Sequence, residues 1–556
     1  MSVGNAAPQK IARTAPQTMT TAEATVQTLL CHGISTVYGL PGIHNDDLFS
    51  AFHGARDRLR FIHTRHEQTG GYMALGAALV TDKPQVCTMV PGPGFLNVGA
   101  ALLTAYGMNA PVLALVGQIP QPDIDRGLGW LHEMRDQIGL ARHISKFAAR
   151  ICSPQEAPML VSEALRQACS GKPGPVVLEC PWDIWGRKGA VSVPEGPLPE
   201  YRAPIDEDAV ESAAKVLGAA RRPIIVLGGG ALNASTEIIA LAEMLEAPVV
   251  AYRRGQGVVP ATHRLNVNLP IAHRLWRNAD AVLAIGTRLF IQQLQWGLDD
   301  NLKVVRIDID PAEPDRFRKP AVALVGDAAD YCAALLRRLP AHNPVRESRT
   351  AEIKEHRAWL AERLSRLEPQ MSFLKAMRAA LPEDGIFVDE VTQLGFASRL
   401  AFPVLNPRTY LSPGYQDTLG WGYGTALGVK VAKPDAPVLS IAGDGGFMYQ
   451  CGELATAALH NIAVVAVVFD NSGFGNVRLI QEERYGGKTI ACDLLNPDFM
   501  KFADSFGVAS FRATNGAELE RALKEAFALQ KPALVHVPCG RMPGPWDMIM
   551  MPKVRG

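Results

Sequence analysis

The chain has 556 residues, of which 47% are hydrophobic, 20% charged and 7% aromatic. This composition is typical of a globular protein and excludes a largely disordered or collagen-like chain, and the length predicts three or four domains because one hydrophobic core does not extend that far. The 56 basic and 55 acidic residues leave a formal net charge of +1, so the chain lacks the positive field that binding to nucleic acid or an anionic membrane requires.

The N-terminal segment and the cysteines indicate the compartment. Residues 1–18 are rich in Ala, Pro, Thr and Gln and are predicted to be disordered, while Thr20 and Glu23 predict a capping box at the start of the first helix. No apolar run reaches the ~18 residues of a membrane-spanning helix, and no signal-peptide core is present. Nine widely spaced cysteines without a C-x-x-C pair predict reduced thiols. We therefore expect a cytoplasmic protein with no membrane partner.

Apolar runs typical of strands alternate with helical patterns along three blocks of the chain. The first block, residues 19–188, has predicted strands at 35–40, 86–90, 112–117 and 175–180. After a proline-rich linker at 194–204, the second block, 205–340, has predicted strands at 223–228, 248–252, 281–286 and 304–310. The third block, 370–540, has predicted strands at 385–390, 437–443, 464–469 and 532–537, and a tail at 541–556 follows. We predict an α/β fold of three doubly wound parallel-sheet domains.

The most specific pattern lies in the third block, where one strand ends at Gly443-Asp444-Gly445-Gly446 and the next ends at Asp470-Asn471. A helix is predicted between them at 448–460. Because neighbouring parallel strands end at one sheet edge, Asp444 and Asn471 are expected to lie together. With the carbonyl of Gly473 they form an oxygen set suited to Mg²⁺, and the glycines and a helix N-terminus would admit a phosphate. The alternative is an ordinary Gly-Asp-Gly turn.

Glu67 stands at the start of an apolar helix directly after a strand, in the segment FIHTRHEQTGG. A carboxylate held near apolar residues is expected to have a raised pKa, which suits a proton-sharing role. The alternative is that Glu67 only caps its helix.

Four further motifs precede the GDG pattern in chain order: VYGLPG at 37–42, TRHE at 64–67, PGPGFLN at 91–97 and GQIP at 117–120. Together they resemble the thiamine diphosphate-dependent enzymes of the acetohydroxyacid (acetolactate) synthase and benzaldehyde lyase branch, from about residue 20 to 540. The segment 174–184 is similar to the benzaldehyde lyase side. The resemblance implies that the three blocks are pyrimidine-binding, central and diphosphate-binding domains, with thiamine diphosphate and Mg²⁺ as cofactors.

The resemblance also implies roles for single residues. Glu67 would hydrogen-bond N1′ of the aminopyrimidine, Leu419 would lie under the bent cofactor rather than only in the core, and His44 and Gln118 would handle substrate and protons. The alternatives are a surface or packing histidine, and an exposed polar loop for Gln118 and residues 130–137. The implied cofactor-binding set is Thr392, Gln393, Leu419, Gly443, Asp444, Gly445, Gly446, Asn471, Gly473, Phe474 and Gly475, of which Asp444, Asn471 and Gly473 would hold the metal. A plain strand-end turn is the alternative for Thr392 and Gln393.

Three departures from the synthase pattern bear on the substrate. His44 replaces a small residue; the tryptophan expected after the metal loop is absent, leaving Ile480, and Asn476 replaces an apolar residue. Together with Phe95, the residues Asn476 and Ile480 predict a wider and more polar pocket than a pyruvate-specific one. The central domain has GGG at 228–230 and GTR at 286–288 but lacks the other flavin motifs, which argues against FAD.

The implied reaction breaks or makes a carbon–carbon bond next to a carbonyl. A 2-oxo acid or 2-hydroxy ketone would lose CO₂ or an aldehyde to give an enamine, which is then protonated or attacks an acceptor carbonyl. A true acetolactate synthase, a 2-hydroxyacyl-CoA lyase, a nucleotide-dependent oxidoreductase and an inactive binding paralogue are the alternatives. No complete G-x-G-x-x-G supports the oxidoreductase.

Assembly is also implied by the resemblance. Glu67 and Asp444 lie in different blocks, so the site is expected to form between two subunits of a homodimer at minimum, commonly within a homotetramer. The tail at 541–556 is expected either to cover the active site as a lid or to pack elsewhere.

Overall fold

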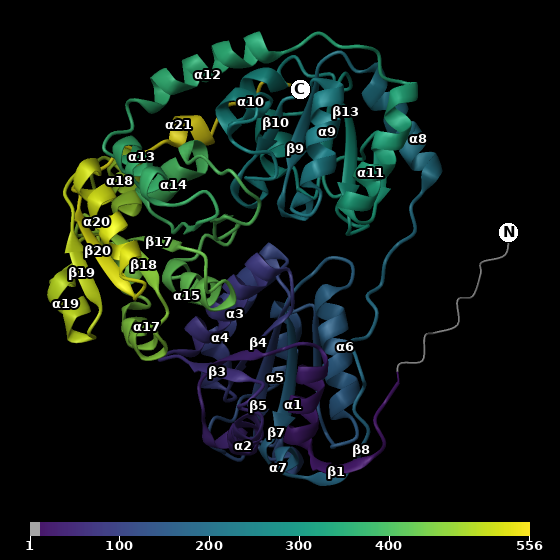
Figure 1. The fold of residues 1–556 in the computed structure, drawn as a ribbon, viewed down its shortest axis with the longest axis vertical. Helices are drawn as coiled ribbons and strands as arrows, with labels where there is room; N and C mark the ends of the chain where they lie inside the picture. The colour runs from purple at the N-terminus through teal and green to yellow at the C-terminus, as the bar shows by residue number, and fades with distance from the viewer. Residues whose placement is uncertain (1–11) are drawn as a thin grey trace. The chain divides into compact units, whose positions relative to one another are not determined.

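The computed structural model describes residues 12–556 and divides the chain into two compact units, Met1–Tyr201 and Arg202–Gly556 (Figure 1). The boundary falls within the proline-rich segment 194–204. One six-stranded sheet belongs to the first unit and two to the second. All neighbouring strands within these three sheets are parallel, which confirms the predicted α/β class.

The first unit is built on the sheet order β3-β2-β4-β5-β7-β6. Its strands are β2 (Thr36–Gly39), β3 (Arg60–His63), β4 (Gln85–Met89), β5 (Val112–Gln118), β6 (Phe147–Arg150) and β7 (Val176–Pro181). Its helices are α1 (Thr21–Cys31), α2 (Asp46–Gly54), α3 (Glu67–Thr81), α4 (Pro93–Met108), α5 (Gln137–Ile144), α6 (Ala157–Cys169) and α7 (Trp182–Trp185). Because β2, β4 and β5 are neighbours, the loops that follow them leave the same edge of the sheet.

The segment before α1 corrects one prediction. Residues 1–11 lie outside the described residues, but β1 (Gln17–Thr20) pairs antiparallel with β8 (Lys188–Val191). Disorder is therefore wrong for the last residues of 1–18, because backbone pairing with a distant strand orders a segment whose composition alone favours disorder. The capping box of Thr20 and Glu23 is present as predicted.

The second unit begins with the central sheet, in the order β11-β10-β9-β12-β13-β14. Its strands are β9 (Pro223–Leu227), β10 (Val249–Ala251), β11 (Asn266–Val267), β12 (Ala281–Ile285), β13 (Lys303–Asp308) and β14 (Val322–Val325). Its helices are α8 (Glu207–Ala219), α9 (Ser235–Leu245), α10 (Leu269–Trp276) and α11 (Ala328–Arg338), and α12 (Thr350–Leu364) then leads along the outside of this domain toward the third (Figure 1).

The third sheet has the order β16-β15-β17-β18-β20-β19. Its strands are β15 (Ile386–Val388), β16 (Tyr410–Leu411), β17 (Val438–Gly443), β18 (Val464–Asp470), β19 (Ala509–Arg512) and β20 (Ala533–Pro538). Its helices are α13 (Gln370–Ala380), α14 (Gln393–Ala401), α15 (Gly422–Ala432), α16 (Asp444–Phe447), α17 (Leu454–His460), α18 (Gly475–Arg484), α19 (Phe499–Ser505), α20 (Gly516–Ala528) and α21 (Trp546–Ile549). One continuous hydrophobic core joins the second and third sheets.

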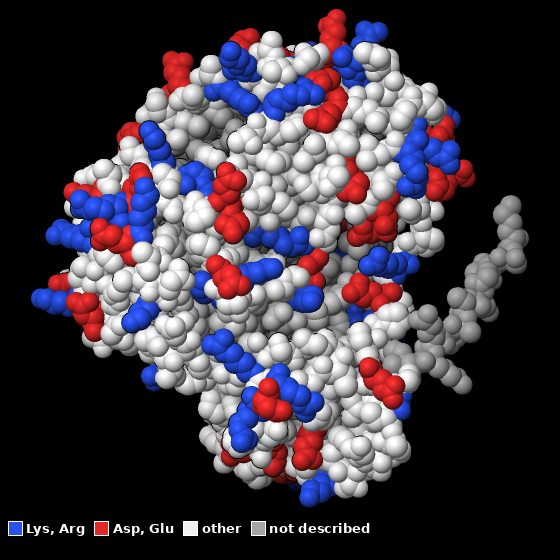
Figure 2. All heavy atoms as spheres, viewed as in Figure 1, with Lys and Arg blue, Asp and Glu red and all other residues white. Residues whose placement is uncertain are grey.

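The mixed charge of the surface and the limited apolarity of the helices agree with the composition. Lysine and arginine side chains are interspersed with acidic ones on the face that Figure 2 presents. In residues 12–556, no helix has both the length and the apolarity needed to cross a bilayer. All nine cysteines are free thiols.

Candidate active site

Asp444 and Asn471 follow the neighbouring strands β17 and β18, in which Gly443 pairs with Phe469. The Asp444 side chain is buried, and its carboxylate accepts a hydrogen bond from the backbone N–H of Gly473 over 3.0 Å. Burial raises the pKa of Asp444. The structure therefore brings Asp444 to the loop after β18, as the strand pattern predicts.

Asn471 presents an oxygen that the protein leaves unused. Its Oδ1 is buried and has no hydrogen-bond partner among the described residues, although buried polar atoms are nearly always paired. A Cβ on Gly475 would lie 2.5 Å from Nδ2 of Asn471, so a larger residue at the start of α18 would displace the Asn471 side chain. The carbonyl of Gly473 accepts from the N–H of Gly475 over 2.9 Å and keeps a second lone pair.

Asn496 completes this edge of the sheet and was not predicted. Its Nδ2 donates to Asp444 over 2.7 Å and to Asp470 over 2.9 Å, and it thereby bridges two carboxylates. Nε2 of His536 lies 3.1 Å from the other oxygen of Asp470. No local pattern could have revealed Asn496, because its two partners lie far from it in the sequence.

The glycines after Asp444 permit close packing. A Cβ on Gly445 would lie 2.6 Å from the ring of Phe474, and a Cβ on Gly446 would lie 3.7 Å from Cδ2 of Leu419. Leu419 and Phe474 therefore both lie beside the GDG turn. The helix predicted at 448–460 begins later: a 3-10 helix covers Cys451–Glu453 and α17 begins at Leu454, while α16 forms a separate single turn at Asp444–Phe447. A helix of one turn has a weak dipole, so the predicted N-terminal field is small here.

The segment after β15 lies beside the same turn. Thr392 is the N-cap of α14, and its hydroxyl accepts from the N–H of Leu394 over 3.1 Å. Gln393 is buried, and its Oε1 has no partner among the described residues. The Thr392 Cβ lies 3.7 Å from the position of a Cβ on Gly443. Thr392 thus has a structural role as a helix cap, and Gln393 presents an unpartnered acceptor.

Glu390 is a second residue that the sequence analysis missed. It is buried, and its carboxyl accepts from the N–H of Gly422 over 2.8 Å and from that of Val391 over 3.1 Å. Burial raises its pKa to about 8. Its Cγ lies 3.3 Å from the position of a Cβ on Gly446. A buried acid with a raised pKa beside the GDG turn is typical of functional sites.

In the first unit, Glu67 is the first residue of α3 and is half-buried. His66 is the N-cap and accepts from the N–H of Gln68, so the suggestion that Glu67 caps the helix is wrong. Oε2 of Glu67 accepts from Nδ2 of Asn97 over 3.0 Å, and Oε1 lies 3.3 Å from the position of a Cβ on Gly94. Glu67 is therefore held against the first turns of α4, in the PGPG motif.

His44 is buried and held in one orientation. Its Nε2 lies 2.9 Å from the carbonyl oxygen of Leu131, which can only accept, so Nε2 carries the hydrogen and Nδ1 the lone pair. Nδ1 is buried without a partner among the described residues. The ring stacks on His132 at 5.0 Å, with Trp182 edge-on at 5.6 Å. Burial lowers the pKa of His44, so the ring is neutral at neutral pH. The suggestion of a surface histidine is wrong.

A single carboxylate organises the loop that holds His44. Glu133 accepts from the backbone N–H groups of Gly127, Leu128, Gly129 and Trp130. These four bonds fix the turn before Leu131, whose carbonyl orients His44. Glu133 could not be recognised from the sequence, because only the folded loop turns four donors toward it.

Gln118 belongs to a buried polar network rather than to an exposed loop. Its Nε2 donates to Glu179 over 3.3 Å, and its Oε1 accepts from the N–H of Ile119 over 2.8 Å. Gln137 also donates to Glu179, over 2.9 Å, and accepts from the N–H of Gly92 over 3.0 Å. The amide of Gln118 therefore has protein partners at both ends, which does not favour direct contact with substrate.

The predicted pocket residues differ in their placement. Phe95 is fully buried inside the first unit, so the structure places it in the interior rather than on an open wall. Asn476 and Ile480 lie on α18 and are half-exposed. Oδ1 of Asn476 has no partner among the described residues, so this side chain can receive a donor.

Three family models match the chain. The N-terminal thiamine pyrophosphate (TPP) binding domain matches residues 19–140, the central domain 210–335 and the C-terminal TPP binding domain 390–537. The chain belongs to the thiamine pyrophosphate enzyme family. Thiamine pyrophosphate is thiamine diphosphate, so the resemblance stated from the motifs is confirmed.

Its relatives cover nearly the whole of this thiamine pyrophosphate enzyme. "Probable 2-ketoarginine decarboxylase AruI" of Pseudomonas aeruginosa is 34% identical and aligns over 94% of each chain. "Probable acetolactate synthase large subunit" of Methanocaldococcus jannaschii is 32% identical over 93% of this chain and 91% of its own. "Acetolactate synthase isozyme 1 large subunit" of Escherichia coli is 29% identical over 93% of each. The protein is an enzyme of the acetolactate synthase-like type.

The free oxygens of this thiamine pyrophosphate enzyme fit a diphosphate bound through a cation. Asn471 Oδ1 is an unpartnered buried acceptor two residues before Gly473, whose N–H binds the Asp444 carboxylate, and hard oxygen ligands are those that Mg²⁺ prefers. The described residues contain no cluster of three His, Cys, Asp or Glu side chains suited to a metal. A cation here would therefore depend on the mixed set of carboxylate, amide and carbonyl oxygens.

The glycine turns of the central domain pack against each other. A Cβ on Gly228 would lie 2.2 Å from the carbonyl oxygen of Gly286, and one on Gly230 would lie 2.8 Å from the Gly286 Cα. The close backbone approach of GGG and GTR explains these glycines by packing, so they supply no evidence for a flavin.

The C-terminal tail of this enzyme is fixed to its own unit. The carbonyl of Pro543 accepts from Gln370, the Trp546 ring packs on Phe396 at 4.7 Å, and the N–H of Val554 donates to Trp296 over 2.9 Å. These contacts support the alternative that the tail packs against the protein rather than serving as a lid.

Proposed function

We propose that the enzyme uses thiamine diphosphate and Mg²⁺ to decarboxylate a 2-oxo acid, with release of an aldehyde or its transfer to an acceptor carbonyl. The observation that carries this proposal is the buried and unpartnered Oδ1 of Asn471, in the loop whose Gly473 N–H binds the buried Asp444 carboxylate. Asp444, Asn471 and the carbonyl of Gly473 would hold the cation. When bound, thiamine diphosphate supplies the electron sink at which the bond next to the carbonyl breaks. We also place the enzyme in the cytoplasm, which its free thiols support.

The protein's own part is to position groups and to move protons. Glu67 is half-buried and its Oε2 accepts from Asn97, so Oε1 would be the oxygen that shares a proton with an aminopyrimidine nitrogen. His44 is neutral and offers the lone pair of Nδ1 to a substrate hydroxyl. The diphosphate would lie close to the backbone at Gly445, Gly446 and Phe474. The start of α14 would approach it through Thr392 and Gln393.

The preferred donor is a 2-oxo acid larger than pyruvate. Asn476 and Ile480 on α18 replace residues that would narrow the pocket, and Asn476 adds a polar group that can recognise a substituent. One relative is named as a probable 2-ketoarginine decarboxylase. A true acetolactate synthase is the second candidate, because other relatives carry that name.

The reaction can be tested with the holoenzyme and four probes: pyruvate, benzoylformate, 2-ketoarginine and benzoin. We expect CO₂ release from benzoylformate or 2-ketoarginine with kcat/KM at least about tenfold above that for pyruvate. Pyruvate is too small to make the pocket contacts of the larger substrates, and contacts of this kind are worth about 1–3 kcal/mol. Acetolactate from pyruvate as the fastest product would instead identify a synthase. Cleavage of benzoin without CO₂ release from any 2-oxo acid would identify a lyase.

We further propose that the active site forms between two subunits. The diphosphate ligands lie in the third domain, 370–540, and Glu67 in the first, 19–188, which belongs to a separate compact unit. A closed two-fold pair would build two equivalent sites, each from both chains. The enzyme would then be a homodimer at minimum, and a homotetramer when two dimers associate.

Complementation tests this assembly. Glu67→Gln and Asp444→Ala are each expected to be inactive, but subunit exchange between them should give mixed dimers with one doubly mutated site and one intact site. Activity should recover to about half of the wild-type value per mixed dimer. Demonstrated exchange without recovery would show that each site is built from one chain. Two copies of the same variant, mixed in the same way, are the control.

A further inference from the structure

The loop between β16 and α15, residues 412–421, carries Leu419. Two residues before it, Asp417 adopts a left-handed backbone with φ +43°, which is uncommon for a residue other than glycine and needs outside support. Beyond Leu419, the indole N–H of Trp421 donates to the carbonyl of Asp389 over 2.7 Å, and Gly422 donates to Glu390. The end of the loop is thus tied to the segment after β15.

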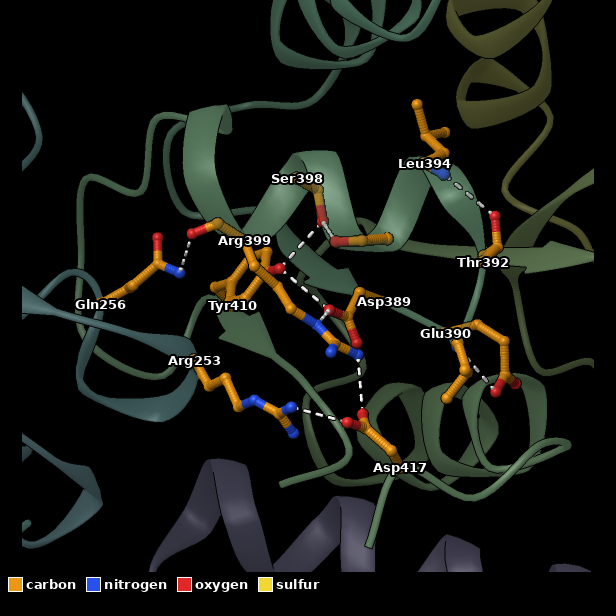
Figure 3. A network of polar contacts seen from close by, with 12 residues as sticks. Arg253, Gln256, Asp389, Glu390, Thr392, Leu394, Ser398, Arg399, Tyr410 and Asp417 are labelled. Atoms are coloured by element: carbon orange, nitrogen blue, oxygen red, sulfur yellow. Dashed lines mark hydrogen bonds and ion pairs between the residues drawn. The ribbon is translucent and has the colours of Figure 1, made fainter. Parts of the chain in front are cut away.

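The middle of the loop is held by two arginines through Asp417. Arg399 lies between Asp389 and Asp417, at 2.9 Å and 3.0 Å, and Arg253 reaches Asp417 from the other side at 2.6 Å (Figure 3). Arg399 and Asp389 are fully buried. Two cations therefore face two carboxylates, and removing the Asp417 charge would leave a buried guanidinium short of a partner.

Arg253 contributes a charged group to this network from the central domain. It follows β10 and has a left-handed φ of +64°, and its side chain remains 21% exposed. A second central arginine, Arg288 after β12, lies 4.5 Å from the ring of Tyr415 in the same loop. Both arginines leave the carboxyl edge of the central sheet, where such domains usually bind a ligand.

We propose that the central domain clamps this loop through Arg253 and Asp417 and thereby positions Leu419 for catalysis. Arg253 is a positioning residue, since it reaches the reacting atoms only through Asp417 and Leu419. The proposal rests on the proposed function for the role of Leu419, but the clamp itself concerns only contacts within one unit. In this enzyme the carboxyl edge of the central sheet thus supports a neighbouring loop.

The clamp is tested first in cofactor-free, full-length protein. Arg253→Met and Asp417→Asn should increase amide hydrogen exchange in peptides covering 412–422 by about fivefold to tenfold, because a largely buried ion pair is lost. Arg253→Lys should restore exchange to within about twofold, since Arg253 makes one contact to Asp417. Arg338→Met, which removes an exposed ion pair with Glu207, is the matched control. Unchanged exchange in both clamp variants would overturn the proposal.

The consequence for catalysis is tested by a double-mutant cycle on the holoenzyme. Arg253→Met should slow hydrogen–deuterium exchange at C2 of bound thiamine diphosphate by about fivefold, but by less than about twofold in a Leu419→Ala background. Equal effects in both backgrounds would show that Arg253 does not act through Leu419. A wild-type protein that binds no thiamine diphosphate would refute the proposed function instead, and loop exchange would still decide the clamp.

Discussion

Asp444→Ala is expected to abolish retention of thiamine diphosphate and of the divalent cation. The substitution removes the one carboxylate of the proposed oxygen set and leaves Asn471 Oδ1 and the Gly473 carbonyl, which are uncharged. It also deprives the N–H of Gly473 of its acceptor and the amide of Asn496 of one of its two acceptors. Loss of a charged ligand should weaken cation binding by at least about a hundredfold.

The measurement is equilibrium dialysis of apo-protein against thiamine diphosphate with and without Mg²⁺, together with activity after reconstitution. Wild-type protein should regain activity only with both. Asp444→Asn, which keeps the size of the side chain, separates loss of charge from loss of packing. Asp435→Ala, at an exposed aspartate of the same domain, is the control. Full activity of Asp444→Ala at micromolar cofactor would refute the metal role of Asp444.

Glu67→Gln is expected to keep the fold and the cofactor but to slow deprotonation at C2 by about 10²- to 10⁴-fold, the usual contribution of a general acid–base group. Glutamine retains an oxygen that can accept from Asn97, so the contact with α4 survives. It cannot share a proton with an aminopyrimidine nitrogen, because an amide has no acidic hydrogen in this pH range.

Hydrogen–deuterium exchange at C2, followed by nuclear magnetic resonance after acid quench, measures this step directly. The affinity for thiamine diphosphate should change by less than about threefold in the same samples. Glu163→Gln, at a carboxylate that pairs with Arg166 on α6 of the same unit, is the matched control. A rate of C2 exchange within about threefold of wild type would remove Glu67 from the proton-sharing role.

The three sheets show which part of the fold is encoded locally. The four strands predicted for each block are the inner four of each sheet, and the unpredicted β6, β11, β14, β16 and β19 all lie at edges. Inner strands are buried on both faces and therefore appear as continuous apolar runs. Edge strands such as β6 are only half-buried, so their sequences resemble those of loops. The strand before Glu67, β3, is an edge strand that its position in the motif revealed.

The candidate site likewise contains residues that a local sequence pattern reveals and residues that no such pattern reveals. Asp444, Asn471 and Glu67 could be identified from the sequence because each follows a strand within a short motif. The sequence could not identify Asn496, Glu133 or Glu390, since their roles depend on donors and acceptors that folding brings to them. The sequence also predicted a helix from residue 448, whereas the structure is helical only from Cys451.

By itself the sequence determined the family and the order of the three domains, and it indicated the residues proposed to carry the chemistry, because buried strands and motif glycines leave a strong local pattern. Only the tertiary structure decided how those residues are held. The orientation of His44 depends on a carbonyl 87 residues away, and the support of Leu419 depends on an arginine of another domain. Hydrogen bonds and ion pairs between distant segments have no local sequence pattern, since each partner is an ordinary polar residue until the fold pairs them.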